Sequence, residues 1–232
     1  MRILIKFATR GRPQKFRQAM DNIRMTIGTD DYLVIVSIDN DDETMMPLLG
    51  EINTMKNTQG YAGKPNGKIA AINRDMNPYE PWDILVNLSD DMFFTANNWG
   101  LIIQREIRDV FKGSLDCFLH FSDGWVNEKL PTMSIMGREY YERFFYIYAP
   151  CYKSVSCDAE AFYVAITLDK HHYFPERIFE HRHPVNVKGN YDQTYKTNDQ
   201  WQDQDTATYF KRMSKNFYVH NPGKTVFDQF KR

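Results

Sequence analysis

The dominant feature of this sequence is a regular alternation of short apolar runs with segments whose apolar residues recur at helical spacing. Apolar runs cover residues 2–8, 32–38 and 83–88, and helical spacing recurs over 13–27 and 68–76. A short continuous apolar run bounded by turn signals is typical of an internal sheet strand. Alternation of such strands with amphipathic helices predicts an α/β fold with a mostly parallel sheet covered by helices on both faces.

The same patterns assign further elements. We expect a helix over 43–55, another that begins after a cap at Asn97 or Asn98, and a strand over 115–121. After Gly124 the patterns are weaker. They predict a strand over 132–136, helices over 138–145 and 203–213, and either a helix or a strand over 161–168. Residues 60–67 read as a turn-rich loop, and His171 and His172 as part of an exposed polar turn. A chain of 232 residues fits one compact domain of this class.

Composition narrows the class of protein. The formal net charge is −1 and the calculated pI is about 6.6, so no global basic field indicates nucleic acid or a membrane surface as the main partner. Three cysteines without CxxC spacing favour a reducing compartment over a disulfide framework or a zinc ribbon. The first ten residues lack the features of a signal peptide, and no apolar run approaches the roughly 20 residues of a membrane span. We expect a soluble, cytoplasmic protein.

Two adjacent carboxylates, Asp90 and Asp91, follow the 83–88 strand. Open α/β sheets bind ligands at the carboxyl ends of their strands. Neighbouring carboxylates repel each other unless something positive lies beside them, and Mg²⁺-type cations favour one or two carboxylates plus substrate phosphates. The pair therefore predicts a divalent cation that carries a phosphorylated ligand. A solvated loop with an Asp helix cap is the alternative.

Polar groups follow the other predicted strands at the same edge of the sheet. Arg10 and Arg12 come after the first strand and suit an anionic ligand. Asp39 and Asp41 come after the second, where a carboxylate accepts from ribose hydroxyls or a base N–H, although helix capping explains at least one acid in this group. Lys68 follows a turn-rich stretch at a helix N-terminus, which is an anion site by geometry. Each signal is weak alone, and their recurrence after successive strands predicts a nucleotide site.

The second half adds two candidate groups. Asp158 and Glu160 lie two residues apart, and either could be a general base if held near an acceptor hydroxyl, with a helix cap as the alternative for Asp158. His181 and His183 form an H-x-H pair whose imidazoles share a face in an extended segment and can bind a metal.

Taken in order, these pieces resemble the glycosyltransferases of the GT-A fold, and most closely the family 2 type. The resemblance covers roughly the first 185 residues and is carried by the segments FATRGRP, VSIDNDD, GKIAAINRDM, LVNLSDDMFF, SCDAEAF and EHRHP. It implies a Rossmann-like, mostly parallel central sheet in a single compact domain. Residues 1–124 would form the nucleotide-sugar-binding half, and 125–232 the half that completes the metal site and meets the acceptor.

The resemblance also implies roles for matched positions. The nucleotide-sugar would contact Thr9, Arg10, Arg12, Asp39, Asp41, Lys68, Asn73, Ser89 and Asp90. Asp91 would bind Mn²⁺ or Mg²⁺ together with His183, and His181 is the rival for the second position. Asp158, with Glu160 beside it, would be the base if the reaction is inverting, whereas a retaining enzyme would not need Asp158 in that role. Ser89 stands where the family carries the first acid of its Asp-x-Asp motif, and Cys157 stands where it carries a Glu.

The leading hypothesis is a metal-dependent glycosyltransferase that uses a nucleoside-diphosphate sugar, with a UDP-sugar favoured. A nucleotidyltransferase acting on sugar phosphates is one alternative, although TRGRP supplies only one of the glycines that such an enzyme would place after its first strand. A non-catalytic sugar-nucleotide or carbohydrate-binding module is another. The acceptor stays open between a glycan, a lipid-linked phosphate and a nucleic acid. A C-terminal set of basic residues would suit an anionic acceptor: Lys211, Arg212, Lys215, Lys224, Lys231 and Arg232.

Overall fold

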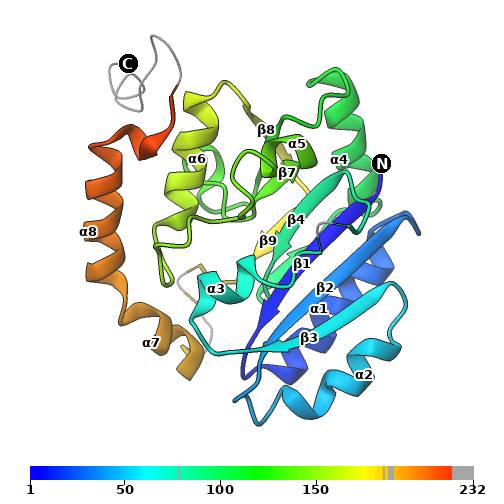
Figure 1. The fold of residues 1–232 in the computed structure, drawn as a ribbon. Coiled ribbons are helices and arrows are strands. Elements are labelled where there is room, and N and C mark those ends of the chain that lie inside the picture. Colours follow the sequence, from blue (N-terminus) through cyan, green and yellow to red (C-terminus); the bar gives the residue numbers. More distant parts are fainter. Residues whose placement is uncertain (78, 185, 188–190, 221–232) are drawn as a thin grey trace.

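The computed structural model describes residues 1–77, 79–184, 186–187 and 191–220. Within these residues, seven strands form one sheet, and a smaller sheet pairs β5 with β9 (Figure 1). From one edge to the other, the large sheet contains β3 (Thr58–Gly63), β2 (Tyr32–Asp39), β1 (Ile3–Thr9), β4 (Ile84–Leu88), β7 (Ile135–Gly137), β6 (Phe118–Ser122) and β8 (His171–Arg177). β7 runs antiparallel to both of its neighbours, and the other neighbouring pairs are parallel. The predicted mostly parallel α/β sheet is confirmed.

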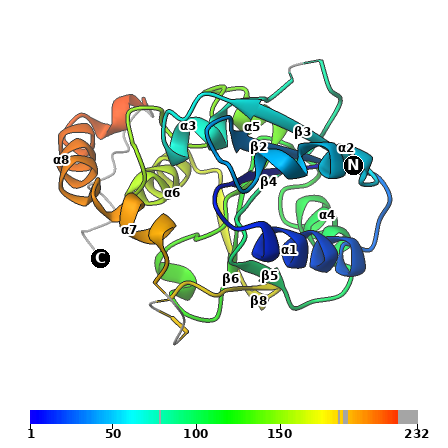
Figure 2. The ribbon, with the colours of Figure 1, turned by 90° about the horizontal axis from the view of Figure 1, so that it is seen from below.

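Helices cover both faces of this sheet because successive side chains of its inner strands point to opposite sides. From β1, Ile3, Ile5 and Phe7 pack in the cluster that includes α1 (Pro13–Thr26) and α4 (Trp99–Asp109), whereas Leu4 packs on the other face. That other face is covered by α3 (Lys68–Asn73), α5 (Arg138–Tyr141) and α6 (Cys157–Thr167). Figure 2 shows α1 and α4 on one side of the sheet and α3 and α5 on the other.

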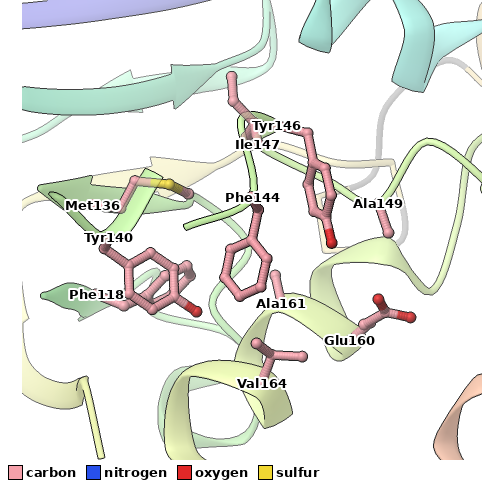
Figure 3. A pocket seen from close by; sticks show the side chains of 10 residues that line it. All are labelled: Phe118, Met136, Tyr140, Phe144, Tyr146, Ile147, Ala149, Glu160, Ala161 and Val164. Carbon is pink, nitrogen blue, oxygen red and sulfur yellow. The ribbon is translucent and has the colours of Figure 1, made fainter. Parts of the chain in front are cut away.

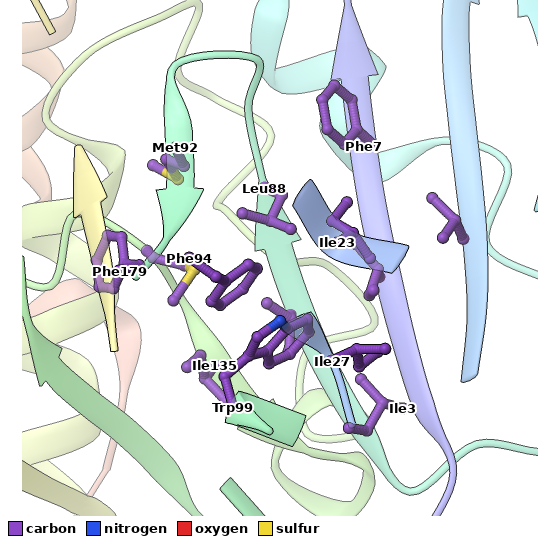
Figure 4. Close-up of a cluster of buried hydrophobic side chains, with 14 of the residues drawn as sticks. Ile3, Phe7, Ile23, Ile27, Leu88, Met92, Phe94, Trp99, Ile135 and Phe179 are labelled. Atoms are coloured by element: carbon purple, nitrogen blue, oxygen red, sulfur yellow. The ribbon is translucent and has the colours of Figure 1, made fainter. Parts of the chain in front are cut away.

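The first of these clusters fixes the strand that leads to the paired carboxylates. Trp99 at the start of α4 stacks on Phe94 with ring centroids 3.7 Å apart, and both pack with Leu88 at the end of β4 (Figure 4). Phe94 ends β5 (Met92–Phe94), which pairs antiparallel with β9 (Phe179–His181). The chain after Asp91 is therefore held between an aromatic core and a second strand.

The chain ends in two helices, α7 (Gln193–Asp199) and α8 (Gln202–Met213), followed by a 3₁₀ turn at Asn216–Tyr218. In Figure 1, α8 lies alongside α6. Two further 3₁₀ turns occupy Met46–Leu48, directly before α2 (Leu49–Thr54), and Asn127–Lys129. In the part of the chain that the structure describes, no helix is long and apolar enough to cross a membrane.

The structure differs from the sequence predictions mainly at the two edges of the sheet. β3 takes up the first half of the expected loop over 60–67, and β8 replaces the expected turn at His171 and His172. Edge strands are exposed on one side, so neither carries a continuous apolar run, and main-chain pairing with β2 and β6 holds them in place. The ambiguous segment 161–168 belongs to a helix, α6. Asn98 lies at the N-terminus of α4 in a left-handed conformation, and its side chain makes no capping hydrogen bond.

Candidate functional site

A cleft of about 510 Å³ opens at the carboxyl ends of β1, β2 and β4. Loops after these strands form part of its wall, and residues of α3, α6, β9 and α7 and of the segment before α6 also line it. Twelve of the predicted site residues line it. Eight come from the predicted nucleotide-sugar group: Thr9, Arg10, Arg12, Asp39, Asp41, Lys68, Ser89 and Asp90. The predicted catalytic Asp158 and the predicted metal ligands Asp91, His181 and His183 line the same cleft.

Asp90 lies at the floor of the cleft and is almost fully buried. Its Oδ1 accepts from Arg12 Nη1 at 2.7 Å, and its Oδ2 accepts from the hydroxyl of Thr9 at 3.1 Å. Burial raises the pKa of Asp90, the Arg12 guanidinium opposes that rise, and the neighbouring Asp91 charge adds to it. Arg12 also donates to Asp192 through Nε and Nη2, at 3.0 and 2.7 Å. Arg12 thus links the end of β4 to the residue that caps α7.

Asp91 has different partners. Ser89 donates a hydrogen bond to its Oδ1, the Tyr195 hydroxyl donates to its Oδ2 at 2.8 Å, and His181 Nε2 lies 3.5 Å from Oδ2. Burial works against ionisation of Asp91, but hydrogen bonds and charge from His181, with Ser89 and Tyr195, hold its pKa well below the usual range. Asp91 is therefore an ionised carboxylate in a buried setting.

The small β5–β9 sheet explains why a histidine stands beside this carboxylate. Its register pairs Met92 with His181, and the next main-chain N–H, from Arg182, donates to the carbonyl oxygen of Asp91 at 2.7 Å. The ring of His183 lies 5.7 Å from that of His181 and packs edge-on against Tyr195. Of the two rival histidines, His181 lies in direct reach of Asp91.

A divalent cation fits this pair of groups. One carboxylate and one imidazole are donors that suit Mn²⁺, and cations of this kind commonly complete their shell with substrate phosphates and water. Across the described residues, no three His, Cys, Asp or Glu side chains are grouped closely enough to hold a metal by themselves. Asp91 and His181 would therefore hold the ion jointly with a ligand.

An ionic network closes the cleft at the end of β2. Arg10 Nη1 donates to Asp39 at 3.0 Å and also pairs with Asp41. Arg74 Nη1 donates to the other oxygen of Asp39 at 2.9 Å, and Arg74 Nη2 donates to the carbonyl oxygen of Ile38 at 2.6 Å. Two arginines therefore orient a buried carboxylate at a position where a base or ribose can be bound.

Asp158 and Lys68 come from helices that begin at the cleft. Lys68 is the first residue of α3, after Gly67 in a positive-φ conformation that favours glycine. Asp158 lies in the first turn of α6, and its Oδ1 accepts from the N–H of Ala159 at 2.9 Å. Among the residues that the structure describes, no hydrogen bond engages its Oδ2, so this carboxylate keeps an oxygen for a group in the cleft.

Two predicted site residues do not line the cleft. Glu160 is buried on the other side of α6, where it accepts from Tyr152 and takes two hydrogen bonds of 2.7 Å from Arg212. Figure 3 shows it at the wall of a separate small cavity among aromatic side chains. Asn73 bonds through Nδ2 to the carbonyl oxygen of Tyr148 and through Oδ1 to main-chain N–H groups of 147–148. Two residues two apart in a helix point about 200° apart, so Glu160 cannot share the cleft with Asp158. Both residues hold the fold together, and neither is retained as a ligand-binding candidate.

Three residues that line the cleft or hold its lining in place were not predicted from the sequence. Tyr195 lines the cleft, whereas Asp192 and Arg74 bond to the lining residues Arg12 and Asp39. Tyr195 and Asp192 belong to α7 and its cap, a polar segment with no apolar periodicity, and no motif singles out Arg74. The predicted basic patch changes too, because Arg212 is committed to Glu160 and Lys224, Lys231 and Arg232 lie outside the described residues. Charge balance was the available signal, since a buried Asp90 requires a cation nearby.

Solved structures of other proteins share the fold of this chain. No protein-family model matches the chain, and neither does any curated protein sequence. Among solved structures, the mannosyltransferase PcManGT from Pyrobaculum calidifontis, in complex with GDP-Man and Mn²⁺, has a TM-score of 0.65 at 13% identity; the match covers 98% of this chain and 67% of that one. S. aureus TarS 1–349 in complex with UDP-GlcNAc has a TM-score of 0.62 at 11% identity, covering 95% of this chain and 76% of that one. The fold of this chain is the GT-A glycosyltransferase fold.

Proposed function

We propose that this protein transfers a sugar from a nucleoside-diphosphate sugar to an acceptor hydroxyl, with a divalent cation as cofactor. One observation carries the proposal: an ionised buried carboxylate, Asp91, shares a large cleft with an imidazole, His181, and with a second carboxylate from another element, Asp158. Solved structures with the same fold include complexes with GDP-Man and Mn²⁺ and with UDP-GlcNAc, which supports this class of donor.

The chemical step assigns a proton and a bond to named groups. Asp158 accepts the proton of the acceptor hydroxyl as the acceptor oxygen forms a bond to the anomeric carbon of the sugar. The bond between that carbon and the diphosphate oxygen breaks, and the nucleoside diphosphate leaves with the electron pair. This is an inverting displacement, because a single substitution from the opposite face reverses the anomeric configuration.

The departing diphosphate needs positive charge. A divalent cation held by Asp91 and His181 would neutralise the charge that develops on the leaving oxygens. Lys68 lines the same cleft and adds a cationic group at the start of α3. Arg12 keeps the adjacent Asp90 compensated, so that carboxylate is free of unbalanced charge when the sugar lies beside it.

The base of the donor would meet the network at the end of β2. Asp39 keeps a defined orientation through Arg10 and Arg74, and a carboxylate accepts from the N–H of uracil or of guanine. We propose a UDP-sugar as the first donor to test and a GDP-sugar as the second. The acceptor is proposed only as a hydroxyl-bearing glycan, lipid-linked glycan or nucleic acid.

Release of free nucleotide from a panel of UDP-, GDP- and CDP-sugars, with and without Mn²⁺, tests the proposal. We expect turnover with at least one donor, loss of Mn²⁺-dependent turnover in Asp91→Asn, and retention in Asp116→Asn, which exchanges a carboxylate paired with Arg143 outside the cleft. Unchanged Mn²⁺-dependent turnover in Asp91→Asn would overturn the metal assignment. Pyrophosphate release from a nucleoside triphosphate and a sugar phosphate would indicate a nucleotidyltransferase instead, and donor binding without any turnover would indicate a binding module.

A further inference from the structure

Two buried polar atoms in the wall of the cleft have no hydrogen-bond partner among the residues that the structure describes. Across the described residues, three buried side-chain nitrogen or oxygen atoms lack a hydrogen bond: Asn87 Oδ1, Ser154 Oγ and His120 Nε2. Asn87 and Ser154 both line the cleft, and they are 5% and 2% exposed. Buried polar groups are almost always satisfied, so a cleft that contains two orphaned atoms is built to receive a ligand's hydrogen bonds.

Asn87 is held rigidly. It belongs to β4, and its main-chain N–H donates to the carbonyl oxygen of Ser134 on the β7 side at 2.9 Å. Its side chain is a hydrogen-bond partner of the Tyr148 hydroxyl, which also bonds to Ser134 Oγ at 3.1 Å. Because Oδ1 is unpaired, the amide nitrogen faces Tyr148 and the amide oxygen is left to accept from a ligand.

Ser154 is fixed by a different element. The buried carboxylate of Asp205, on α8, accepts from the main-chain N–H groups of Lys153, Ser154 and Val155 at 2.7–3.2 Å. This clamp sets the loop before α6 without using the Ser154 hydroxyl. The hydroxyl can therefore donate or accept in the cleft with no competing internal bond.

The residues around Asn87 and Ser154 indicate which part of a nucleotide-sugar would reach their unpaired atoms. Tyr148 packs in the same buried cluster as Cys157, the first residue of α6, and Ser154 lies in the loop that leads into this helix. The two orphaned atoms therefore belong to the α6 side of the cleft, where the proposed base Asp158 also lies. The base-binding network at Asp39 belongs to the end of β2. The Asn87 oxygen can only accept, so it suits the O–H groups of a sugar and does not suit a phosphate, whose oxygens also accept. The Ser154 hydroxyl can donate to or accept from the same sugar hydroxyls.

We propose that Asn87 and Ser154 form a subsite that hydrogen-bonds hydroxyl groups of the transferred sugar and so selects the donor by its sugar. The inference rests on the proposed function, because it assumes a sugar-nucleotide in the cleft. Its contribution is the gain in affinity of a nucleotide sugar over the corresponding free nucleotide.

Titration calorimetry of the full chain with UDP, UDP-GlcNAc, GDP and GDP-Man, each with Mn²⁺, measures that gain. Ser154→Ala removes a hydroxyl that has no internal partner, so it should fold as the wild type does, and Asn87→Leu replaces the amide by an apolar group of similar shape. Each variant should lose roughly three- to tenfold in affinity for the nucleotide sugar and keep its affinity for the free nucleotide. Ser134→Ala is the matched control, because Ser134 contacts the same Tyr148 hydroxyl without lining the cleft.

The outcomes are separable. An unchanged gain in both variants, or an equal loss in Ser134→Ala, would overturn the subsite. A wild-type protein that binds a free nucleotide and gains nothing from either sugar would also overturn the subsite while leaving nucleotide binding intact. A wild-type protein that binds no nucleotide or nucleotide sugar would overturn the proposed function itself.

Discussion

Replacing Arg12 by methionine removes the guanidinium that faces Asp90. Arg12 is 9% exposed at its side chain and Asp90 is 4%, so the pair is buried and its loss is not relieved by solvent. Truncating one partner of a buried pair leaves an uncompensated charge, which Asp90 would escape by taking up a proton. Protonating a carboxyl of ordinary pKa, about 3.9, costs about 4 kcal/mol at pH 7, so the free energy of unfolding should fall by up to that amount.

The pH dependence follows from the same argument. In Arg12→Met the folded state holds a proton on Asp90 that the unfolded chain releases above about pH 4. The wild-type folded state releases that proton as well, but only above the raised pKa of its buried Asp90. The penalty relative to the wild type therefore grows above that pKa, by about 1.4 kcal/mol per pH unit up to neutrality. Urea unfolding at pH 5 and pH 7 measures this slope. Adding Asp90→Asn should remove the slope and recover much of the loss. Arg17→Met is the control on the same helix, because its partner Glu51 is exposed and the pair is screened by solvent. A loss below about 1 kcal/mol at pH 7, or one independent of pH, would refute the reasoning.

Three further predictions concern catalysis, acid stability and packing. Asp158→Asn should lower turnover by roughly a hundredfold or more. Glu160→Gln should lower the melting temperature, because it weakens the contacts with Arg212, and should keep its turnover at a temperature where it is folded. Equal losses of turnover in the two variants would contradict the separation of these two carboxylates. Burial lowers the pKa of His120 to about 4 and that of His171 to about 3. Below about pH 6.5 the unfolded chain therefore binds more protons than the folded protein, and the free energy of unfolding should fall on acidification. For His120 alone the loss at pH 5 should be about 2 kcal/mol. Urea unfolding should show a smaller pH slope in His120→Phe and an unchanged slope in His172→Gln, where the histidine is exposed. Gly137→Ala would bring a Cβ to 2.1 Å from the carbonyl oxygen of Leu115 and should destabilise the protein by about 1–3 kcal/mol. In the control Gly50→Ala, the added Cβ meets no atom within 4 Å and should not destabilise the protein. Equal stability of the two variants by thermal unfolding would contradict the packing described for β7.

The parts of the fold that were predictable are those whose residues carry a local signal. β1, β2 and β4 are buried on both faces and therefore read as apolar runs, and α1 shows one apolar face through Phe16, Met20 and Ile23. β3 and β8 lie at the edges and are held by main-chain bonds, which leave no apolar run in the sequence. Hydrophobic patterns in the sequence therefore did not predict these two edge strands.

The residues of the cleft also differ in whether a local sequence pattern predicts them. Residues directly after a buried strand, such as Arg10, Asp39 and Asp91, were predictable because parallel strands end at one edge. Tyr195 lies 104 positions from the Asp91 carboxylate that it contacts, and the choice of His181 over His183 depends on the register of β5 with β9. These are consequences of tertiary packing, so no local pattern contains them. Glu160 shows the opposite error, since two nearby acids in one helix read as a pair although the helix turns them to different sides.

The adjacent carboxylates Asp90 and Asp91 are equivalent in sequence, and their partners make them different groups. Asp90 has a full positive charge at 2.7 Å, from Arg12, and is balanced within the protein. Within the described residues, the salt-bridge partner of Asp91 is His181, an imidazole that carries a charge only when protonated. A metal ion competes with that proton, because imidazole binds metals in its neutral form. The charge of Asp91 is thus balanced by a group that a cation can replace, whereas that of Asp90 is balanced by an arginine. This difference is why the proposed cation is assigned to Asp91 and not to a position between the two acids.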